Sequence, residues 1–177
     1  MYNRKETKTV FVGSVPVGGD NPISVQSMTN VPAEDFENSI KQIKQLEKAG
    51  CDIVRLAVPK AECAEVFSLA KKAGVKCPLV ADIHFDYKIA LECVRHGVDK
   101  VRINPGNIGE KWKVKEVAEA CKNASIPIRI GVNGGSLDKK LLAKYSHPCA
   151  EALAESALTE AEALEDCGFS DIVISIK

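Results

Sequence analysis

The feature of this chain that most constrains its fold is a regular alternation of helical segments and short apolar runs. Four predicted helices stop at a glycine that stands just before an apolar run, namely Gly50, Gly74, Gly97 and Gly168. Runs begin near positions 51, 77, 99 and 127, at intervals of 22–28 residues. Continuous apolar strands separated by helices are typical of a parallel sheet that is buried under helices. The pattern therefore predicts an α/β fold.

The same periodicity predicts six strands, each followed by a helix except the last. The strands are predicted at 23–28, 51–58, 78–83, 99–104, 127–132 and 171–176. The helices are predicted over 33–49, 61–73, 86–96, 110–122 and 138–167, the last one broken near Pro148. The first 20 residues alternate around a Gly-Ser turn at 13–14, which predicts a lead-in hairpin.

A doubly wound open sheet and a (β/α)₈ barrel both fit this repetition. The first strand–helix turn lacks a GxGxxG pattern, which weakens the dinucleotide-binding form of the open sheet. Polar residues follow nearly every strand, as in a barrel that builds one site from many loops. We therefore predict a partial TIM-type barrel of about six of the eight βα units that closure needs. Its sheet should curl and stay open between its first and last strands.

A full barrel usually needs about 250 residues, and this chain has 177 and stops directly after a strand. We therefore expect a portion of a longer protein. Residues 1–20 would form the hairpin lead-in, and residues 21–177 a truncated TIM-type barrel domain.

Composition excludes several classes of protein. The 24 Lys and Arg residues balance 24 Asp and Glu residues, which argues against a general nucleic-acid binder. No apolar run approaches a membrane span, and the first residues lack the apolar core of a secretory signal, so we expect a cytoplasmic protein. The seven cysteines include no CxxC pair, which predicts reduced thiols and no metal site in this chain.

Polar side chains gather where the predicted strands end. They are Gln26, Ser27, Arg55, Asp82, His84, Arg102, Asn104, Arg129, Asn133 and Lys177. Residues two or four apart on a strand point to one face of the sheet, as Arg102 and Asn104 do. If that face is the barrel interior, these side chains converge at its mouth.

Three arginines and a lysine in one mouth call for an anionic partner, since a buried charge is costly unless it is paired. One alternative is internal pairing, for example of Arg55 or Arg102 with Asp82. A single carboxylate does not neutralise four cations, so we favour binding of phosphate or diphosphate. The glycine-containing loops at 104–107 and 133–136 could add backbone donors, although plain turns are the simpler interpretation. Asp82 and His84 are the best acid/base candidates, unless His84 is a structural, hydrogen-bonded histidine.

Six motifs in one order resemble those of the hydroxymethylbutenyl diphosphate synthase (IspG or GcpE) family. They are VQSMTN at 25–30, DIVRLAVP at 52–59, PLVADIHFDY at 78–87, VDKVRINPGNIG at 98–109, IPIRIGVN at 126–133 and DIVISIK at 171–177. The similarity covers nearly the whole chain from about Val15. It implies the N-terminal barrel portion of an oxidoreductase of the non-mevalonate isoprenoid pathway.

The resemblance implies reductive conversion of 2-C-methyl-D-erythritol 2,4-cyclodiphosphate to 4-hydroxy-3-methylbut-2-enyl diphosphate, with flavodoxin or ferredoxin as electron donor. It also implies a homodimer in which the barrel of one subunit faces a 4Fe-4S cluster on the other. The cluster's three cysteines and a glutamate would lie in a separate domain beyond Lys177, so this fragment would carry no cofactor and would be inactive by itself.

By resemblance, Arg55, Arg102, Asn104, Arg129, Asn133 and Lys177 would bind substrate, with Asp82 and His84 catalytic and no metal ligand in this chain. Two other functions remain open. One is another phosphate-binding barrel enzyme, such as a pterin-binding synthase, and the other is a non-catalytic phosphate-binding fragment.

Overall fold

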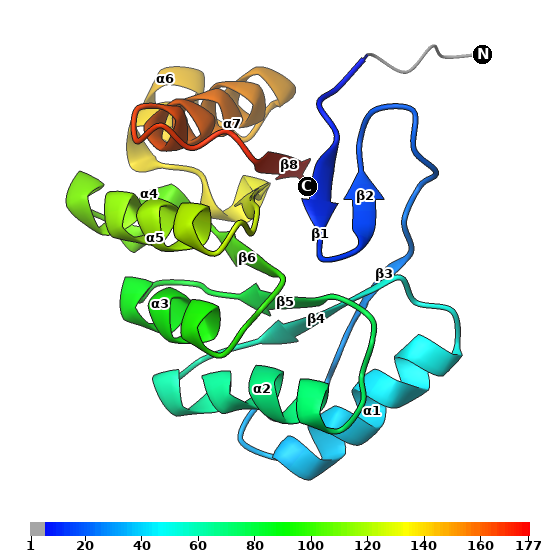
Figure 1. Cartoon of the computed structure of the whole chain (residues 1–177). Coiled ribbons are helices and arrows are strands. Elements are labelled where there is room, and N and C mark those ends of the chain that lie inside the picture. Colours follow the sequence, from blue (N-terminus) through cyan, green and yellow to red (C-terminus); the bar gives the residue numbers. More distant parts are fainter. Residues whose placement is uncertain (1–5) are drawn as a thin grey trace.

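A computed structural model describes residues 6–177 and contains one curled parallel sheet of six strands (Figure 1). The strands are β3 (Gln26–Met28), β4 (Ile53–Ala57), β5 (Leu79–Asp82), β6 (Lys100–Ile103), β7 (Ile128–Val132) and β8 (Ile172–Ile176). Their spatial order is their order along the chain, and every neighbouring pair is parallel. A doubly wound sheet reverses its strand order at a switch point, whereas a barrel does not. The predicted partial TIM-type barrel is confirmed.

The helices lie along one side of the sheet (Figure 1). They are α1 (Phe36–Lys48), α2 (Glu65–Lys72) after the 3₁₀ turn η1 (Ala61–Ala64), α3 (Tyr87–Arg95), α5 (Lys111–Asn123), α6 (Lys139–Tyr145) and α7 (Ala150–Glu165). The four glycines predicted to end helices all have positive φ, between 70° and 92°, which L side chains rarely adopt. The predicted break near Pro148 separates α6 from α7.

Two loops differ from the plain turns that we expected. Residues Pro105–Ile108 form a short helix, α4, and Gly134–Ser136 form a 3₁₀ turn, η2. Both follow directly on the carboxyl end of a strand, where the chain turns outward toward the helix layer. Backbone hydrogen bonds from the amides of Asn107 and Ile108 to the carbonyl of Asn104 close the first of these turns.

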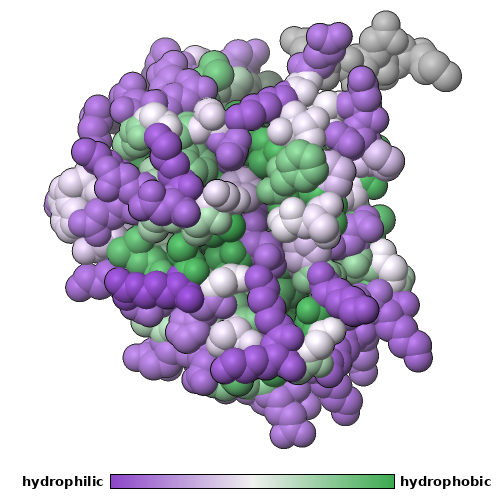
Figure 2. Space-filling model, viewed as in Figure 1, coloured by the Kyte–Doolittle hydropathy of each residue, from purple (hydrophilic) through white to green (hydrophobic). Residues whose placement is uncertain are grey.

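The main core lies between the sheet and the helices. Strand residues that point outward are buried there, for example Val54, Leu56 and Ile130, and they belong to one apolar cluster with Phe67 of α2. Alternate residues on the same strands face the hollow side of the sheet. Hydrophilic side chains cover most of the periphery of the face in Figure 2, with apolar residues visible between them.

A hairpin of β1 (Val10–Val12) and β2 (Val15–Val17) lies on the other side of the sheet from the helices (Figure 1). Val12 packs against Ile53 and Val80 near the amino ends of β4 and β5, in a second apolar cluster. The hairpin therefore fills the lower part of the hollow. The carboxyl-terminal end of the hollow is left open.

The sheet is open between β3 and β8, which each have one strand neighbour among residues 6–177. Apolar side chains are exposed along both edges, including Ile23 and Val25 beside β3 and Ile174 and Ile176 on β8. The gap that we predicted is present. In the described part of the chain no helix is both long and apolar enough to cross a membrane.

Candidate functional site

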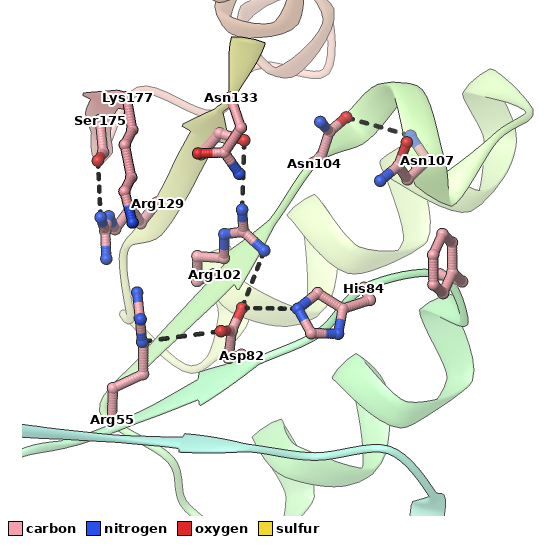
Figure 3. A pocket seen from close by; sticks show the side chains of 12 residues that line it. Arg55, Asp82, His84, Arg102, Asn104, Asn107, Arg129, Asn133, Ser175 and Lys177 are labelled. Carbon is pink, nitrogen blue, oxygen red and sulfur yellow. Dashed lines mark hydrogen bonds and ion pairs between the residues drawn. The ribbon is translucent and has the colours of Figure 1, made fainter. Parts of the chain in front are cut away.

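A pocket of about 480 Å³ opens at the carboxyl ends of β4 to β8 (Figure 3). It is lined by Arg55, Asp82, His84, Phe85, Arg102, Asn104, Asn107, Arg129, Gly131, Asn133, Ser175 and Lys177. All eight residues that we predicted as the site are among them. The pocket forms because inward-facing residues of five neighbouring strands end at the same edge of the curled sheet.

Asp82, at the end of β5, is the hub of the pocket. Its side chain is 7% exposed. Arg102 Nη1 donates to Asp82 Oδ1 at 3.0 Å, and Arg55 Nε lies 3.7 Å from Oδ2. His84 Nε2 lies 3.7 Å from Oδ1. One buried carboxylate is thus shared by three side chains, and it holds the two guanidinium groups in fixed positions.

Arg102 lies against the backbone of the neighbouring strand. Its Nη2 donates to the carbonyl oxygen of Gly131 at 3.3 Å. A Cβ placed on Gly131 would stand 2.5 Å from Arg102 Nε and 2.6 Å from Nη2. Glycine at this position therefore makes room for the guanidinium, which is a packing requirement, not a demand for unusual backbone angles.

Arg129 on β7 is the register partner of Arg102 on the neighbouring strand β6. Its side chain also interacts with β8 on the other side. Its Nη2 donates to Ser175 Oγ at 2.6 Å. Burial first, and then the charges of Arg55 and Arg102, lower the pKa of Arg129. An arginine remains protonated through such a shift, so its charge stays in place at a cost in free energy. In Figure 3 the Lys177 side chain extends toward Arg129 from the end of β8.

The charges of the pocket do not balance. Its lining has four permanent cations, Arg55, Arg102, Arg129 and Lys177, and one carboxylate, Asp82, for a net charge of +3 with His84 neutral. Internal pairing does occur, because Asp82 binds both Arg102 and Arg55. Across residues 6–177, no ion pair involves Arg129 or Lys177. The arrangement can therefore hold a multiply charged anion.

The upper rim of the pocket is polar. The His84 side chain is 54% exposed and stands beside Phe85. Asn104 is buried, and its Oδ1 accepts from the backbone amide of Asn107 at 3.2 Å. That bond ties the end of β6 to α4, so Asn104 positions the loop above the guanidinium groups.

Some residues of this region escaped the sequence reasoning. Ser175 lies two residues before Lys177, and Lys100 two before Arg102, so each shares the inward face of its strand. That two-residue step was the available signal. Conversely, Gln26 and Ser27 do not line the pocket, and the β3 residue near it is Met28, whose Sδ accepts from Arg55 Nη2 at 3.1 Å.

The cysteines do not fit an iron–sulfur cluster. The seven thiols are unpaired, and among residues 6–177 no three His, Cys, Asp or Glu side chains are grouped as metal ligands. Burial raises the pKa of Cys121 to about 12 and that of Cys77 to about 11. Because a cluster ligand must be a thiolate, such thiols are poor candidates.

Two kinds of comparison identify the family. A family model described as the GcpE TIM-barrel domain matches residues 7–177. A relative from Clostridium acetobutylicum, named 4-hydroxy-3-methylbut-2-en-1-yl diphosphate synthase (flavodoxin), is 58% identical over 174 residues, which are 98% of this chain and 50% of the relative. A relative of the same name from Symbiobacterium thermophilum is 54% identical over 177 residues, which are 100% of this chain and 48% of the relative. The chain spans about half the length of the curated relatives it matches.

Solved structures support the architecture alone. Dihydropteroate synthase from Vibrio fischeri matches with a TM-score of 0.67 at 11% identity, over 95% of this chain and 66% of that one. The enzyme from Xanthomonas albilineans has a TM-score of 0.67 at 13% identity, over 94% and 64% of the two chains. At such low identity the likeness extends to the fold and not to the chemistry. Because the family model covers almost all of the sequence and the named relatives share more than half of its residues, the chain belongs to the GcpE TIM-barrel domain family.

Proposed function

We propose that this chain is the substrate-binding barrel of a 4-hydroxy-3-methylbut-2-en-1-yl diphosphate synthase and that its pocket holds a cyclic diphosphate. The observation that carries the proposal is the surplus of three positive charges around one concave site at the carboxyl ends of the strands. Guanidinium groups bind phosphate oxygens through paired N–H donors, and a volume of about 480 Å³ is suitable for a small metabolite. The names of relatives that are 52–58% identical agree with this substrate class.

Among the four cations of the pocket, Arg129 and Lys177 are the most available to bind the diphosphate. Neither is engaged by a carboxylate among the described residues, whereas Asp82 already holds Arg55 and Arg102. The latter pair would contribute their remaining N–H donors. Asn104 and Asn133, at the ends of β6 and β7, would bind the oxygen atoms that the cations leave unsatisfied.

Asp82 and His84 would serve the hydroxyl-bearing part of the substrate. His84 is exposed toward the pocket while its Nε2 lies 3.7 Å from Asp82 Oδ1. A histidine in this position can deliver a proton to a hydroxyl that leaves as water, and the carboxylate orients its ring. Reductive removal of a hydroxyl needs such a proton together with two electrons.

We infer that the electrons come from an iron–sulfur cluster held elsewhere in the enzyme, since the thiols described above do not suit one. Flavodoxin or ferredoxin would reduce it. We further propose a cytoplasmic homodimer in which the barrel of one subunit faces the cluster of the other, with residues 21–177 as the barrel domain. The 177-residue chain should then bind substrate without converting it.

Calorimetric titration with 2-C-methyl-D-erythritol 2,4-cyclodiphosphate tests the proposal. Arg129→Ala should weaken binding by about 1.5–3 kcal/mol, the usual range for a hydrogen bond to a charged group. Arg95→Ala is the matched control, because Arg95 is an exposed arginine on α3, outside the pocket, with a side chain that is 69% exposed. Equal affinities for the two variants would contradict the proposed site. Turnover by the purified chain with reduced flavodoxin would contradict the division of roles.

A further inference from the structure

A buried lysine lies directly below the pocket. Lys100 begins β6, two residues before Arg102, so both side chains face the hollow of the sheet. Lys100 is only 3% exposed. Its register partner on β5 is Val80, which packs with Val12 of the hairpin. The lysine therefore lies between the apolar hairpin plug and the guanidinium groups of the pocket floor.

No side chain among residues 6–177 pairs with the ammonium of Lys100. Its Nζ forms no hydrogen bond or ion pair with these residues, but it is not one of the fully buried polar atoms that lack a partner, so it keeps some contact with solvent. A lysine with this degree of burial is rare unless a carboxylate neutralises it. Burial, followed by the charges of Arg129 and Arg55, lowers its pKa from 10.5 to about 8.

The charged groups near Lys100 lie on four of the strands, β4 to β7. β4 contributes Arg55, β7 contributes Arg129, and β6 itself contributes Arg102. β5 contributes Asp82, but that carboxylate already binds Arg102 at 3.0 Å. The hairpin strands β1 and β2 and the sheet strands β3 and β8 have no charged side chain, but Lys177 directly follows β8 and adds a further positive charge to the pocket. Lys100 thus faces like charges on two sides and apolar residues below.

We propose that Lys100 is a proton-linked member of the anion site, partly neutral when the pocket is empty and protonated when a multiply charged anion binds above it. The inference rests on the proposed anion-binding function. It adds to the site a titratable amine that lies below the permanent cations. An anion between Arg55 and Arg129 offsets the positive potential that opposes protonation of the amine. The proton comes from solvent, and no other bond changes.

Binding of cyclic trimetaphosphate, measured by titration calorimetry in HEPES and in Tris, tests this linkage. Each phosphate of this probe has one strongly acidic group, so the probe does not titrate between pH 7 and 9. The difference in heat between the two buffers gives the number of protons taken up. With the empty-site pKa near 8, the protein should take up about half a proton at pH 8 and about nine tenths at pH 9. Its Kd should rise about fivefold over that interval.

Variants separate Lys100 from other titrating groups. Lys100→Met keeps the length of the side chain without its charge and should abolish the uptake. Lys100→Arg keeps the charge and should also abolish it, while binding more tightly than the wild type at pH 9. Lys44→Met, on the exposed face of α1, should leave the uptake unchanged.

Two results would overturn the inference while leaving the proposed function intact. One is trimetaphosphate binding by the wild type without proton uptake at pH 9, which is decisive even if the Lys100 variants fail to fold. The other is uptake that persists in Lys100→Met. Uptake that decreases from pH 7 to 9 would assign the proton to a group other than Lys100 and would likewise refute the inference. Failure of trimetaphosphate to bind at all would instead count against the anion pocket itself.

Discussion

A buried carboxyl group on α7 should make the protein less stable as the pH rises. Glu160 is 8% exposed. Its Oε1 accepts from Ser156 Oγ at 3.3 Å, but its Oε2 is buried and has no hydrogen-bond partner among the residues that the structure describes. Burial raises the pKa of Glu160 from 4.5 to about 7, against smaller opposite effects of Ser156 and Arg102. The native state therefore prefers the neutral carboxylic acid.

The direction of the pH effect follows from that preference. A carboxyl group with a raised native pKa contributes its full stability below the unfolded pKa of 4.5 and loses that contribution as the pH rises through about 7. Each pKa unit corresponds to about 1.4 kcal/mol, so ionisation of Glu160 costs at most roughly 3 kcal/mol. The group lines a cavity of about 200 Å³ between α5 and α7, where water can relax part of that cost. We expect an effect of ~1–3 kcal/mol.

Glu160→Gln isolates this effect, because the amide has the same shape, can still accept from Ser156 and does not ionise. Urea unfolding at pH 5 and pH 8.5 gives the free energy of unfolding of both proteins. The advantage of the variant over the wild type should increase by ~1–3 kcal/mol between the two pH values. Effects of all other titrating groups cancel in this comparison. Glu116→Gln, on the exposed side of α5, is the matched control and should show no such increase. An advantage of Glu160→Gln that does not change with pH would refute the reasoning.

Three further predictions concern packing and assembly. Gly131→Ala should displace the Arg102 guanidinium, since its Cβ would stand 2.5 Å from Arg102 Nε, and should weaken diphosphate binding tenfold or more (~1.4 kcal/mol) in calorimetry; unchanged affinity would contradict the packing argument. Val12→Ala should destabilise the chain by about 1–3 kcal/mol in urea unfolding, because Val12 is fully buried against Ile53 and Val80; an effect near zero would mean that the hairpin does not plug the hollow. The open, apolar edges of β3 and β8 should promote self-association, which light scattering on a concentration series detects. A protein that stays monomeric at high concentration and has protected amides in β8 would contradict this prediction.

The succession of elements was predictable because its signals are local. Apolar runs and glycine stops placed β5 (Leu79–Asp82) inside the predicted 78–83 and β8 (Ile172–Ile176) inside 171–176. The first strand was overestimated, since only Gln26–Met28 pair with β4 whereas 23–28 were predicted. Ile23 is 82% exposed at this open edge, so its apolar character alone did not extend the strand. The length of an edge strand depends on how far it pairs with its one neighbour, and its own residues do not reveal that.

The sequence did not predict the single helical turns at Pro105–Ile108 and Gly134–Ser136. Their glycines and asparagines are typical of turns, and nothing in their spacing distinguishes a plain turn from one turn of helix. Contacts between α4 and the neighbouring helices α5 and α7 accompany the helical form. The contacts with α7 join segments far apart in the sequence.

The sequence by itself determined the βα repetition and the set of polar residues at the strand ends, because both follow from local patterns along the chain. It also determined the family resemblance, because that depends on the order of short motifs. Only the tertiary structure decided how those residues interact. The sharing of Asp82 by Arg55, Arg102 and His84 depends on the register of three strands. The burial of Lys100 beneath them depends on the curl of the sheet and on the hairpin that fills its lower end. Distances between side chains on different strands are set by register and curvature, which no single segment of the sequence encodes.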